Sequence, residues 1–372
     1  MKRTLLVTLD FYPKIGGVAN YYYNLCLNLP KEKIFVLTTK EKEAGTSQKF
    51  QIYREKLLAE SFFVWPKWLL LVFELWKRAR ALKIELIWSG DILPTGTAAL
   101  IVSKLLKIPY IVSCHGKDLL LADGHRRKSW LARFVLRRAK LVTVNSKYTG
   151  EIVRSFGVDK EKIRIIYPGI NKPADGAISE EEKSELLEKY ELKSKEVLLS
   201  VGRLVERKGF DKVIEAIAAA RRDLPDLIYI ISGTGEDRER LTDLAAGKEG
   251  IRFIGRLSDR EKDILFSVAD VFIMTSRASE DDVEGFGIVY LEAAIFGKPS
   301  IAGGEGGAKE AVVDGETGIL VDPRSEQEIA RAIIKLFKNK NIRQEMGQRA
   351  KERAEKDFLW QKIAKEMEII LN

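Results

Sequence analysis

Cysteine and histidine are scarce in this sequence of 372 residues, which contains two of each. Cys26 and Cys114 each lie within an apolar run, a placement that suits neither a disulfide framework nor a metal cluster. Such cysteine usage is typical of a reducing compartment. Aspartate and histidine residues with the spacing of metal ligands are lacking as well, so no metal site is predicted.

Long uninterrupted apolar runs are also missing. Met1-Lys2-Arg3 is followed by the stretch TLLVTLD, which is too short for a secretory signal, and we therefore expect a cytoplasmic protein. The most apolar segment, residues 61–83, is interrupted by Pro66, Lys67 and Glu74. It falls short of the roughly 20 apolar residues that cross a bilayer.

The charge is distributed unevenly. Residues 1–175 contain 31 Lys and Arg against 15 Asp and Glu, a net charge of +16, whereas the whole chain carries +9. A basic half of this kind indicates an anionic partner, which is a nucleic acid, a membrane surface or a phosphorylated substrate. The alternative is a lysine-rich surface of the thermophile type. Because no nucleic-acid fold signature or platform of aromatic and basic residues is present, we expect no nucleic-acid partner.

The length and the pattern of apolar runs predict two α/β domains. Short strand-like runs alternate with helical segments in both halves, which is typical of parallel sheets with crossover helices. The first half has TLLVTLD, KIFVLTTK, IELIWS, PYIVSCHG, KLVTVNS and IRIIYPGI, and the second has VLLSVGRL, LIYIISGTG, IRFIGRL, DVFIMTS, KPSIAGG and GILVD. Residues 171–183 read as a linker. We expect a ligand at the carboxyl ends of the strands, where two such domains face each other.

Two features of the first half are candidates for ligand contact. Gly16 and Gly17 form a strand-to-helix turn in which backbone N–H groups can approach a phosphate or a sugar, although a simple tight turn explains them equally well. His115 follows an apolar strand, at a position suited to a reaction centre. A structural role in a turn is the alternative.

Two motifs of the second half point to a bound diphosphate. Arg203 and Lys208 lie at a strand end and the following helix start, where two fixed cations can stabilise a departing diphosphate. Further along, Glu284 and Glu292 flank the start of a predicted helix. The backbone N–H groups of its first residues, Gly287, Ile288 and Val289, can bind a phosphate. Glu292 lies in the apolar run IVYLEAAIF, where burying it without a partner would be costly.

Together these residues resemble family 4 of the retaining glycosyltransferases, which have the GT-B fold of two facing Rossmann-like domains. The matching positions are Gly16-Gly17, His115-Gly116, VNS at 144–146, YPGIN at 167–171, Arg203, Lys208 and the Glu284/Glu292 pair. The resemblance implies that the glycine turn and the Arg/Lys pair bind the donor diphosphate. It also implies that Glu284 touches the sugar, that Glu292 binds the ribose and that His115 lines the reaction centre.

The same resemblance implies three parts of the chain: an acceptor-binding domain in residues 1–172, a nucleotide-sugar-binding domain in 173–354, and a helix in 355–372 that returns to the first domain. The segments DVEGFGIVYLEA and IAGGEGGAKEAV are similar to bacterial phosphatidylinositol mannosyltransferases. This similarity suggests GDP-mannose as the donor substrate, without a further cofactor, and a lipid-linked or sugar acceptor. A UDP-sugar-dependent transferase, an epimerase and a phosphorylase of the same fold remain alternatives.

Two segments of the basic half predict an anionic membrane as a partner. Residues 61–83 combine aromatic residues with a basic end, and residues 125–140, HRRKSWLARFVLRRAK, form a second basic stretch. We expect these segments to hold the protein peripherally on an anionic membrane. The alternative for the apolar part of residues 61–83 is an ordinary core helix.

Overall fold

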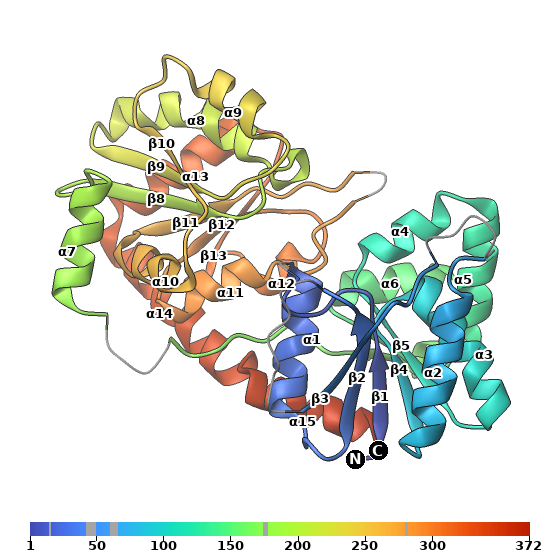
Figure 1. Cartoon of the computed structure of the whole chain (residues 1–372). Coiled ribbons are helices and arrows are strands. Elements are labelled where there is room, and N and C mark those ends of the chain that lie inside the picture. Colours follow the sequence, from blue (N-terminus) through green and yellow to red (C-terminus); the bar gives the residue numbers. More distant parts are fainter. Residues whose placement is uncertain (15, 42–49, 60–65, 174–177, 280–281) are drawn as a thin grey trace. The chain divides into compact units, whose positions relative to one another are not determined.

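The computed structural model describes residues 1–14, 16–41, 50–59, 66–173, 178–279 and 282–372. The chain forms two compact units (Figure 1). The first contains Met1–Gly169, Trp360–Asn372 and the described residues of the segment Glu280–Gly285. The second contains Ile170–Ser279 and Phe286–Leu359.

The first unit is built on a sheet of seven parallel strands in the order β3-β2-β1-β4-β5-β6-β7. The strands are β1 (Thr4–Val7), β2 (Ile34–Thr39), β3 (Gln51–Glu55), β4 (Leu86–Ser89), β5 (Tyr110–Cys114), β6 (Leu141–Val144) and β7 (Ile163–Ile165). The central strands are buried on both faces, as expected for a parallel sheet covered by helices.

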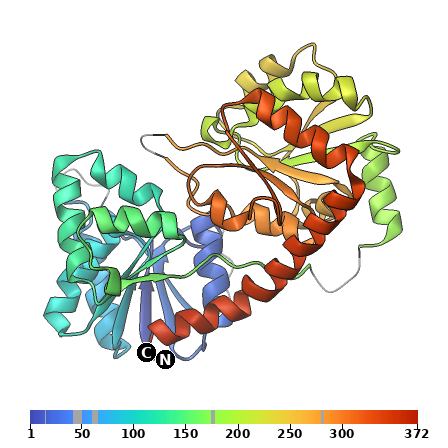
Figure 2. The same cartoon turned by 180° about the vertical axis from the view of Figure 1, so that it is seen from behind.

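Helices cover both faces of this sheet, and each face has its own apolar core. On one face lie α1 (Gly17–Asn28) and, from the far end of the sequence, α15 (Trp360–Ile370), which packs beside it (Figure 2). The other face carries α2 (Leu69–Ala81), α3 (Thr97–Leu106), α4 (Lys117–Asp123), α5 (Arg126–Arg138) and α6 (Lys147–Ser155). The last helix of the chain is therefore part of the first core.

The second unit repeats the arrangement with six parallel strands in the order β10-β9-β8-β11-β12-β13. The strands are β8 (Glu196–Val201), β9 (Leu227–Ser232), β10 (Ile251–Gly255), β11 (Val271–Met274), β12 (Ser300–Gly303) and β13 (Gly318–Val321). Its helices are α7 (Glu180–Lys189), α8 (Phe210–Asp223), α9 (Arg238–Ala245), α10 (Asp259–Val268), α11 (Ile288–Ile295), α12 (Ala308–Ala311), α13 (Glu326–Lys338) and α14 (Lys340–Asp357). The pair α8 and α13 packs on one face, and α10, α11 and α14 cover the other (Figure 1).

The strand order places a topological switch point in each sheet. The order reverses between β1 and β4 in the first unit and between β8 and β11 in the second. In open parallel sheets, ligands bind outside the carboxyl ends of the strands at such points. The loops after β1, β4, β8 and β11 are therefore the first places to search for a site.

The strand predictions are confirmed, because each predicted apolar run of both halves contains a strand. The strand β3 was not predicted, since its sequence QIYRE is polar and it lies at the sheet edge, where its residues stay partly exposed. The linker prediction is partly wrong. Although residues 174–177 lie outside the described ranges, α7 already begins at Glu180, with Ser179 and Glu182 forming a capping box.

The domain limits also differ from those expected. The chain passes between the units at Gly169 and Ile170 rather than after residue 172. Residues 282–285 belong to the first unit, although they were expected in the second domain. The final segment that belongs to the first unit begins at Trp360 rather than at the expected residue 355, which still lies within α14 of the second unit.

Candidate functional site

The glycine turn after β1 leads directly into α1. Gly16 is the residue before the helix and Gly17 is its first residue. A Cβ atom added at either position would meet no heavy atom within 4 Å. Packing within the described part of the chain therefore does not demand glycine here, and the open space agrees with the predicted approach of a ligand.

His115 follows β5 and is held by groups from three elements. Its backbone N–H donates to Asp118 Oδ1 at 2.9 Å, and its carbonyl accepts from Asn145 Nδ2 at 3.3 Å. The ring Nε2 lies 2.7 Å from the hydroxyl of Tyr22 on α1. Desolvation by the surrounding side chains lowers the pKa of His115 to about 4, so the ring is neutral at pH 7.

The segment 282–285 lies against His115 and its neighbours within the first unit. Lys117 Nζ is 3.2 Å from Asp282 Oδ2, and Val283 is buried. A Cβ at Gly285 would lie 2.5 Å from the His115 carbonyl oxygen, so the two backbones are in close contact. This contact brings Glu284, the residue before Gly285, into the same unit as His115. The sequence predicted both residues but placed them in different domains.

Two partly buried aspartates near His115 were not predicted. Asp91 follows β4, and Asp118 is in the first turn of α4. Desolvation raises the pKa of Asp91 to about 7 and that of Asp118 to about 6. Within the described residues, one buried oxygen of each carboxylate has no hydrogen-bond partner. The sequence signal was a polar residue after a buried strand, which many loops share, so it did not single them out.

Arg203 and Lys208 follow β8, at the switch point of the second unit. The Arg203 side chain is exposed and has no ion pair or hydrogen bond to any residue that the structure describes. The neighbouring acids pair with a different cation, because Arg277 bonds both carboxylate oxygens of Asp211, at 3.2 and 3.0 Å, and Glu206 at 3.2 Å. The two predicted cations therefore lie in a loop whose acidic residues are already neutralised.

The amino end of α11 lies at the same edge of the second sheet. Gly287 has a φ of 90°, a left-handed conformation that favours glycine, and the Tyr290 hydroxyl anchors the helix to the Met274 carbonyl of β11 at 2.6 Å. The amide N–H groups of residues 287–289, including Ile288 and Val289, have no acceptor among the described residues. They form the unpaired N–H groups of a helix start, as predicted for a phosphate.

Glu292 has the partner that its apolar surroundings require. Lys262 Nζ, on α10, lies 2.8 Å from Glu292 Oε1. Burial by itself lowers the pKa of Lys262. The attraction and hydrogen bond of Glu292, together with the nearby Asp259 and Asp263, more than offset that effect, so the pKa is raised. The sequence did not indicate Lys262, because it lies 30 residues before Glu292 on a different helix and no sequence pattern pairs the two.

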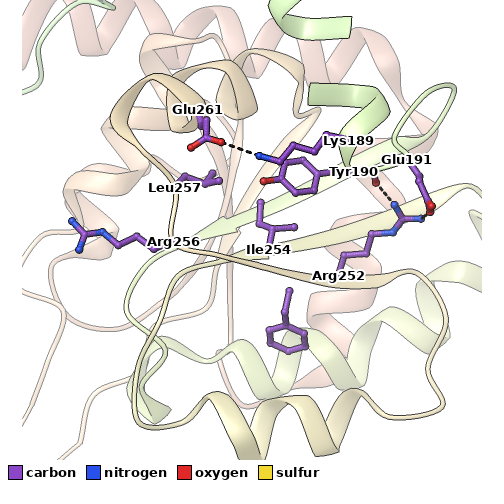
Figure 3. A pocket seen from close by; sticks show the side chains of 9 residues that line it. Lys189, Tyr190, Glu191, Arg252, Ile254, Arg256, Leu257 and Glu261 are labelled. Carbon is purple, nitrogen blue, oxygen red and sulfur yellow. Dashed lines mark hydrogen bonds and ion pairs between the residues drawn. The ribbon is translucent and has the colours of Figure 1, made fainter. Parts of the chain in front are cut away.

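A surface pocket of about 690 Å³ lies elsewhere in the second unit, along the outer edge of β10 (Figure 3). Four of its charged groups form two pairs, with Lys189 Nζ 3.0 Å from Glu261 Oε1 and Arg252 Nη2 2.9 Å from Glu191 Oε2. No predicted site residue lines it. Its lining residues are Lys189, Tyr190, Glu191, Arg252, Phe253, Ile254, Arg256, Leu257 and Glu261.

Metal ligands and membrane spans were searched for in the described ranges. No three His, Cys, Asp or Glu side chains gather there in a way that would hold a metal ion. No helix there combines the length and the apolar character needed to cross a membrane.

Two family models match successive parts of the chain. The model described as Glycosyltransferase Family 4 matches residues 15–172, and the one described as Glycosyl transferases group 1 matches residues 182–353. Between them they cover every predicted site residue.

Characterised relatives match over nearly the whole chain. The GDP-mannose-dependent alpha-(1-6)-phosphatidylinositol monomannoside mannosyltransferase of Mycolicibacterium smegmatis is 30% identical, over 96% of this chain and 94% of its own. A GDP-mannose-dependent monoacylated alpha-(1-6)-phosphatidylinositol monomannoside mannosyltransferase of Corynebacterium glutamicum is 27% identical, over 100% and 98%.

Solved structures share the fold. Anabaena Alr3699/HepE in complex with UDP and glucose superimposes with a TM-score of 0.83 at 21% identity, over 100% of this chain and 99% of the other. Sucrose-phosphate synthase from Thermosynechococcus elongatus gives 0.81 at 18% identity, over 100% and 98%. The α/β fold expected from the sequence, with two Rossmann-like domains of the GT-B type, is thus confirmed. With both halves matched and a 30% identical relative aligned from end to end, the chain belongs to glycosyltransferase family 4 and is a glycosyltransferase.

Proposed function

We propose that the protein is a retaining mannosyltransferase that uses GDP-mannose and transfers the sugar to a hydroxyl of a lipid-linked acceptor. The observation that carries this proposal is the end-to-end similarity to GDP-mannose-dependent transferases. The cations and unpaired amides at the switch point of the second unit support it, because they suit a nucleoside diphosphate.

In the proposed reaction the acceptor oxygen forms a bond to the anomeric carbon while the bond from that carbon to the diphosphate oxygen breaks. The bonding electrons leave with the nucleoside diphosphate, and the hydroxyl proton passes to a diphosphate oxygen. Negative charge therefore grows on the leaving group. Arg203, Lys208 and the N–H groups at the start of α11 would stabilise that charge. Fixed cations would thereby take the role of a divalent metal.

The two glutamates have different proposed partners. Glu292 would accept hydrogen bonds from the ribose diol, with Lys262 holding its carboxylate in place. Glu284 would contact the sugar, since it lies beside the backbone contact between Gly285 and His115. Gly16 and Gly17 would let the backbone approach the donor or the acceptor, because no described atom fills the space beside them.

The donor is tested by thermal unfolding in the presence of GDP-mannose, UDP-glucose and ADP-glucose. A ligand at 100 times its Kd stabilises the folded state by about 2.7 kcal/mol, which raises Tm measurably. We expect this stabilisation with GDP and GDP-mannose at concentrations at which the other two leave Tm unchanged. With GDP-mannose and a glycolipid acceptor, the product should keep the anomeric configuration of the donor, which NMR of the product reads directly.

Stabilisation by UDP-glucose alone would contradict the choice of donor and favour a UDP-sugar-dependent transferase. A product with inverted configuration would contradict retention. Conversion of the free sugar nucleotide without any acceptor would instead favour the epimerase alternative.

An anionic membrane is the proposed source of the acceptor. On one face of the first sheet, large apolar side chains are exposed on adjacent helices: Leu69 and Phe73 on α2, Leu105 on α3, and Trp130 on α5. The same helices and the residue after α3 carry exposed basic side chains, namely Lys77, Arg80, Lys104, Lys107, Arg126, Arg127, Lys128, Arg137 and Arg138. We call this set the basic-apolar face. The other side of α2 is part of the core, as the alternative interpretation of this segment expected, because Leu71, Leu75 and Ala79 are buried.

Vesicle co-sedimentation tests this surface. Each basic residue near an anionic bilayer contributes about 1 kcal/mol, so we expect binding to phosphatidylglycerol vesicles, weakening with added salt, and none to neutral vesicles. Replacing Phe73 and Trp130 by alanine should release the protein. The control is Ile369→Ala, which removes an exposed apolar side chain of α15 on the opposite face of the sheet. Unchanged binding of the double variant, or equal binding to neutral vesicles, would contradict the assignment.

A further inference from the structure

The hydroxyl of Tyr22 lies between two partners in the first unit. It is 2.6 Å from the Gly90 carbonyl oxygen and 2.7 Å from His115 Nε2. Both Tyr22 and Gly90 are buried, and the Tyr22 ring packs edge-on against the His115 ring at 5.3 Å between centroids. The phenol is therefore fixed in place.

A phenol carries one proton. Ser113 also hydrogen-bonds this hydroxyl, but a serine hydroxyl can itself be the donor, so the phenol proton has to serve either Gly90 or His115. The Gly90 carbonyl can only accept, and Tyr22 is its only hydrogen-bond donor within the described residues. If the proton pointed at His115, a buried carbonyl would lose its partner, which is unfavourable. The phenol proton therefore goes to Gly90, and the short contact to His115 requires a proton on Nε2.

We propose that Tyr22 is a positioning residue that fixes His115 as the Nε2–H tautomer and so leaves Nδ1 as a hydrogen-bond acceptor for a substrate hydroxyl. Nδ1 has no partner among the described residues, and the ring is only partly buried. The inference deepens the proposed function, because it rests on the placement of His115 at the reaction centre.

The surroundings of the ring favour the neutral form. The titratable groups near the His115 ring are Tyr21 and Tyr22 on α1, Asp91 after β4 and Asp118 on α4. Asp118 accepts from the His115 backbone rather than from the ring, so no contact within the described part of the chain stabilises a second ring proton. A neutral ring with a bare Nδ1 accepts a hydrogen bond from a sugar hydroxyl and has no proton to donate from that atom.

The wild-type protein gives the first test, since it contains only two histidines. Long-range proton–nitrogen NMR spectra of protein labelled with ¹⁵N-histidine distinguish protonated from bare ring nitrogens. In the His125→Gln variant the signals of His125 are absent, so the remaining ring signals belong to His115. We expect a protonated Nε2 and a bare Nδ1 at pH 7. A protonated Nδ1 at that pH, in either the neutral or the charged ring, would overturn the proposal without any variant of Tyr22.

The second test compares two adjacent tyrosines. Tyr21 also packs edge-on against His115 at 5.3 Å, but its hydroxyl donates to the Ile166 carbonyl, 3.3 Å away. Tyr22→Phe should mix the two tautomers and lower kcat about tenfold, as expected for losing one orienting hydrogen bond. Tyr21→Phe should change neither the tautomer nor kcat.

The outcomes separate this inference from the proposed function. An unchanged tautomer in Tyr22→Phe would overturn the role of Tyr22. A changed tautomer with unchanged turnover would overturn the contact between His115 and the substrate, while GDP-mannose use, judged by thermal unfolding, would stand or fall separately.

Discussion

Replacing Arg203 or Lys208 by alanine should lower kcat by about two orders of magnitude, which corresponds to about 2.7 kcal/mol of lost transition-state stabilisation. The two cations lie at the switch point of the second unit, and Arg277 already neutralises the nearby carboxylates of Asp211 and Glu206. Arg203, which has no ion pair or hydrogen bond among the described residues, is thus available to a ligand. The effect should fall on kcat more than on KM, because the diphosphate gains charge in the transition state.

Steady-state kinetics of the two single variants and the double variant measure this effect. Both side chains would act on one diphosphate, so the double variant should lose less than the product of the single losses. The matched control is Arg222→Ala, which removes an exposed arginine from the opposite end of α8, the helix that begins just after Lys208. Near wild-type turnover in both single variants, with unchanged Tm, would contradict the assignment.

The fold could be predicted because most of the strands have a recognisable sequence pattern. Parallel strands buried on both faces appear as short apolar runs, such as IELIWS and DVFIMTS, separated by segments of helical length. The edge strand β3 lacks that pattern, since edge residues face water and need no apolar run. The return of α15 to the first core was expected only from the family resemblance, because an amphipathic helix does not reveal which core it covers.

The candidate site follows from the sequence in parts rather than as a whole. Residues next to strand ends, such as Arg203 and His115, were found because the rule on strand carboxyl ends needs only sequence order. Lys262 and Tyr22 were missed because they reach their partners from neighbouring helices, across 30 and 93 residues of sequence. Tyr22 also lies in the run YYYNLCLNL, where it is indistinguishable from a core residue.

Gly285→Ala should lower kcat by about two orders of magnitude without weakening the binding of nucleoside diphosphate. A Cβ at this position would lie 2.5 Å from both Asn145 Nδ2 and the His115 carbonyl oxygen, closer than such atoms can approach. Neither neighbour can yield easily. The His115 carbonyl belongs to the backbone after β5, and Asn145 Oδ1 is held by the Thr149 hydroxyl at 2.8 Å.

The added methyl group must therefore displace the segment that carries Glu284, and a displacement of about 1 Å at a reaction centre costs on the order of 100-fold in rate. The proposed nucleotide-binding residues Arg203, Lys208 and Glu292 belong to the second unit, so GDP binding measured by calorimetry should persist. Gly124→Ala is the matched control, because a Cβ there meets only the Leu120 carbonyl, at an ordinary 3.7 Å. Full turnover of Gly285→Ala, or a loss of GDP binding as large as its loss of turnover, would contradict the proposed role of the segment, since its backbone contact with His115 would then not serve the transfer step.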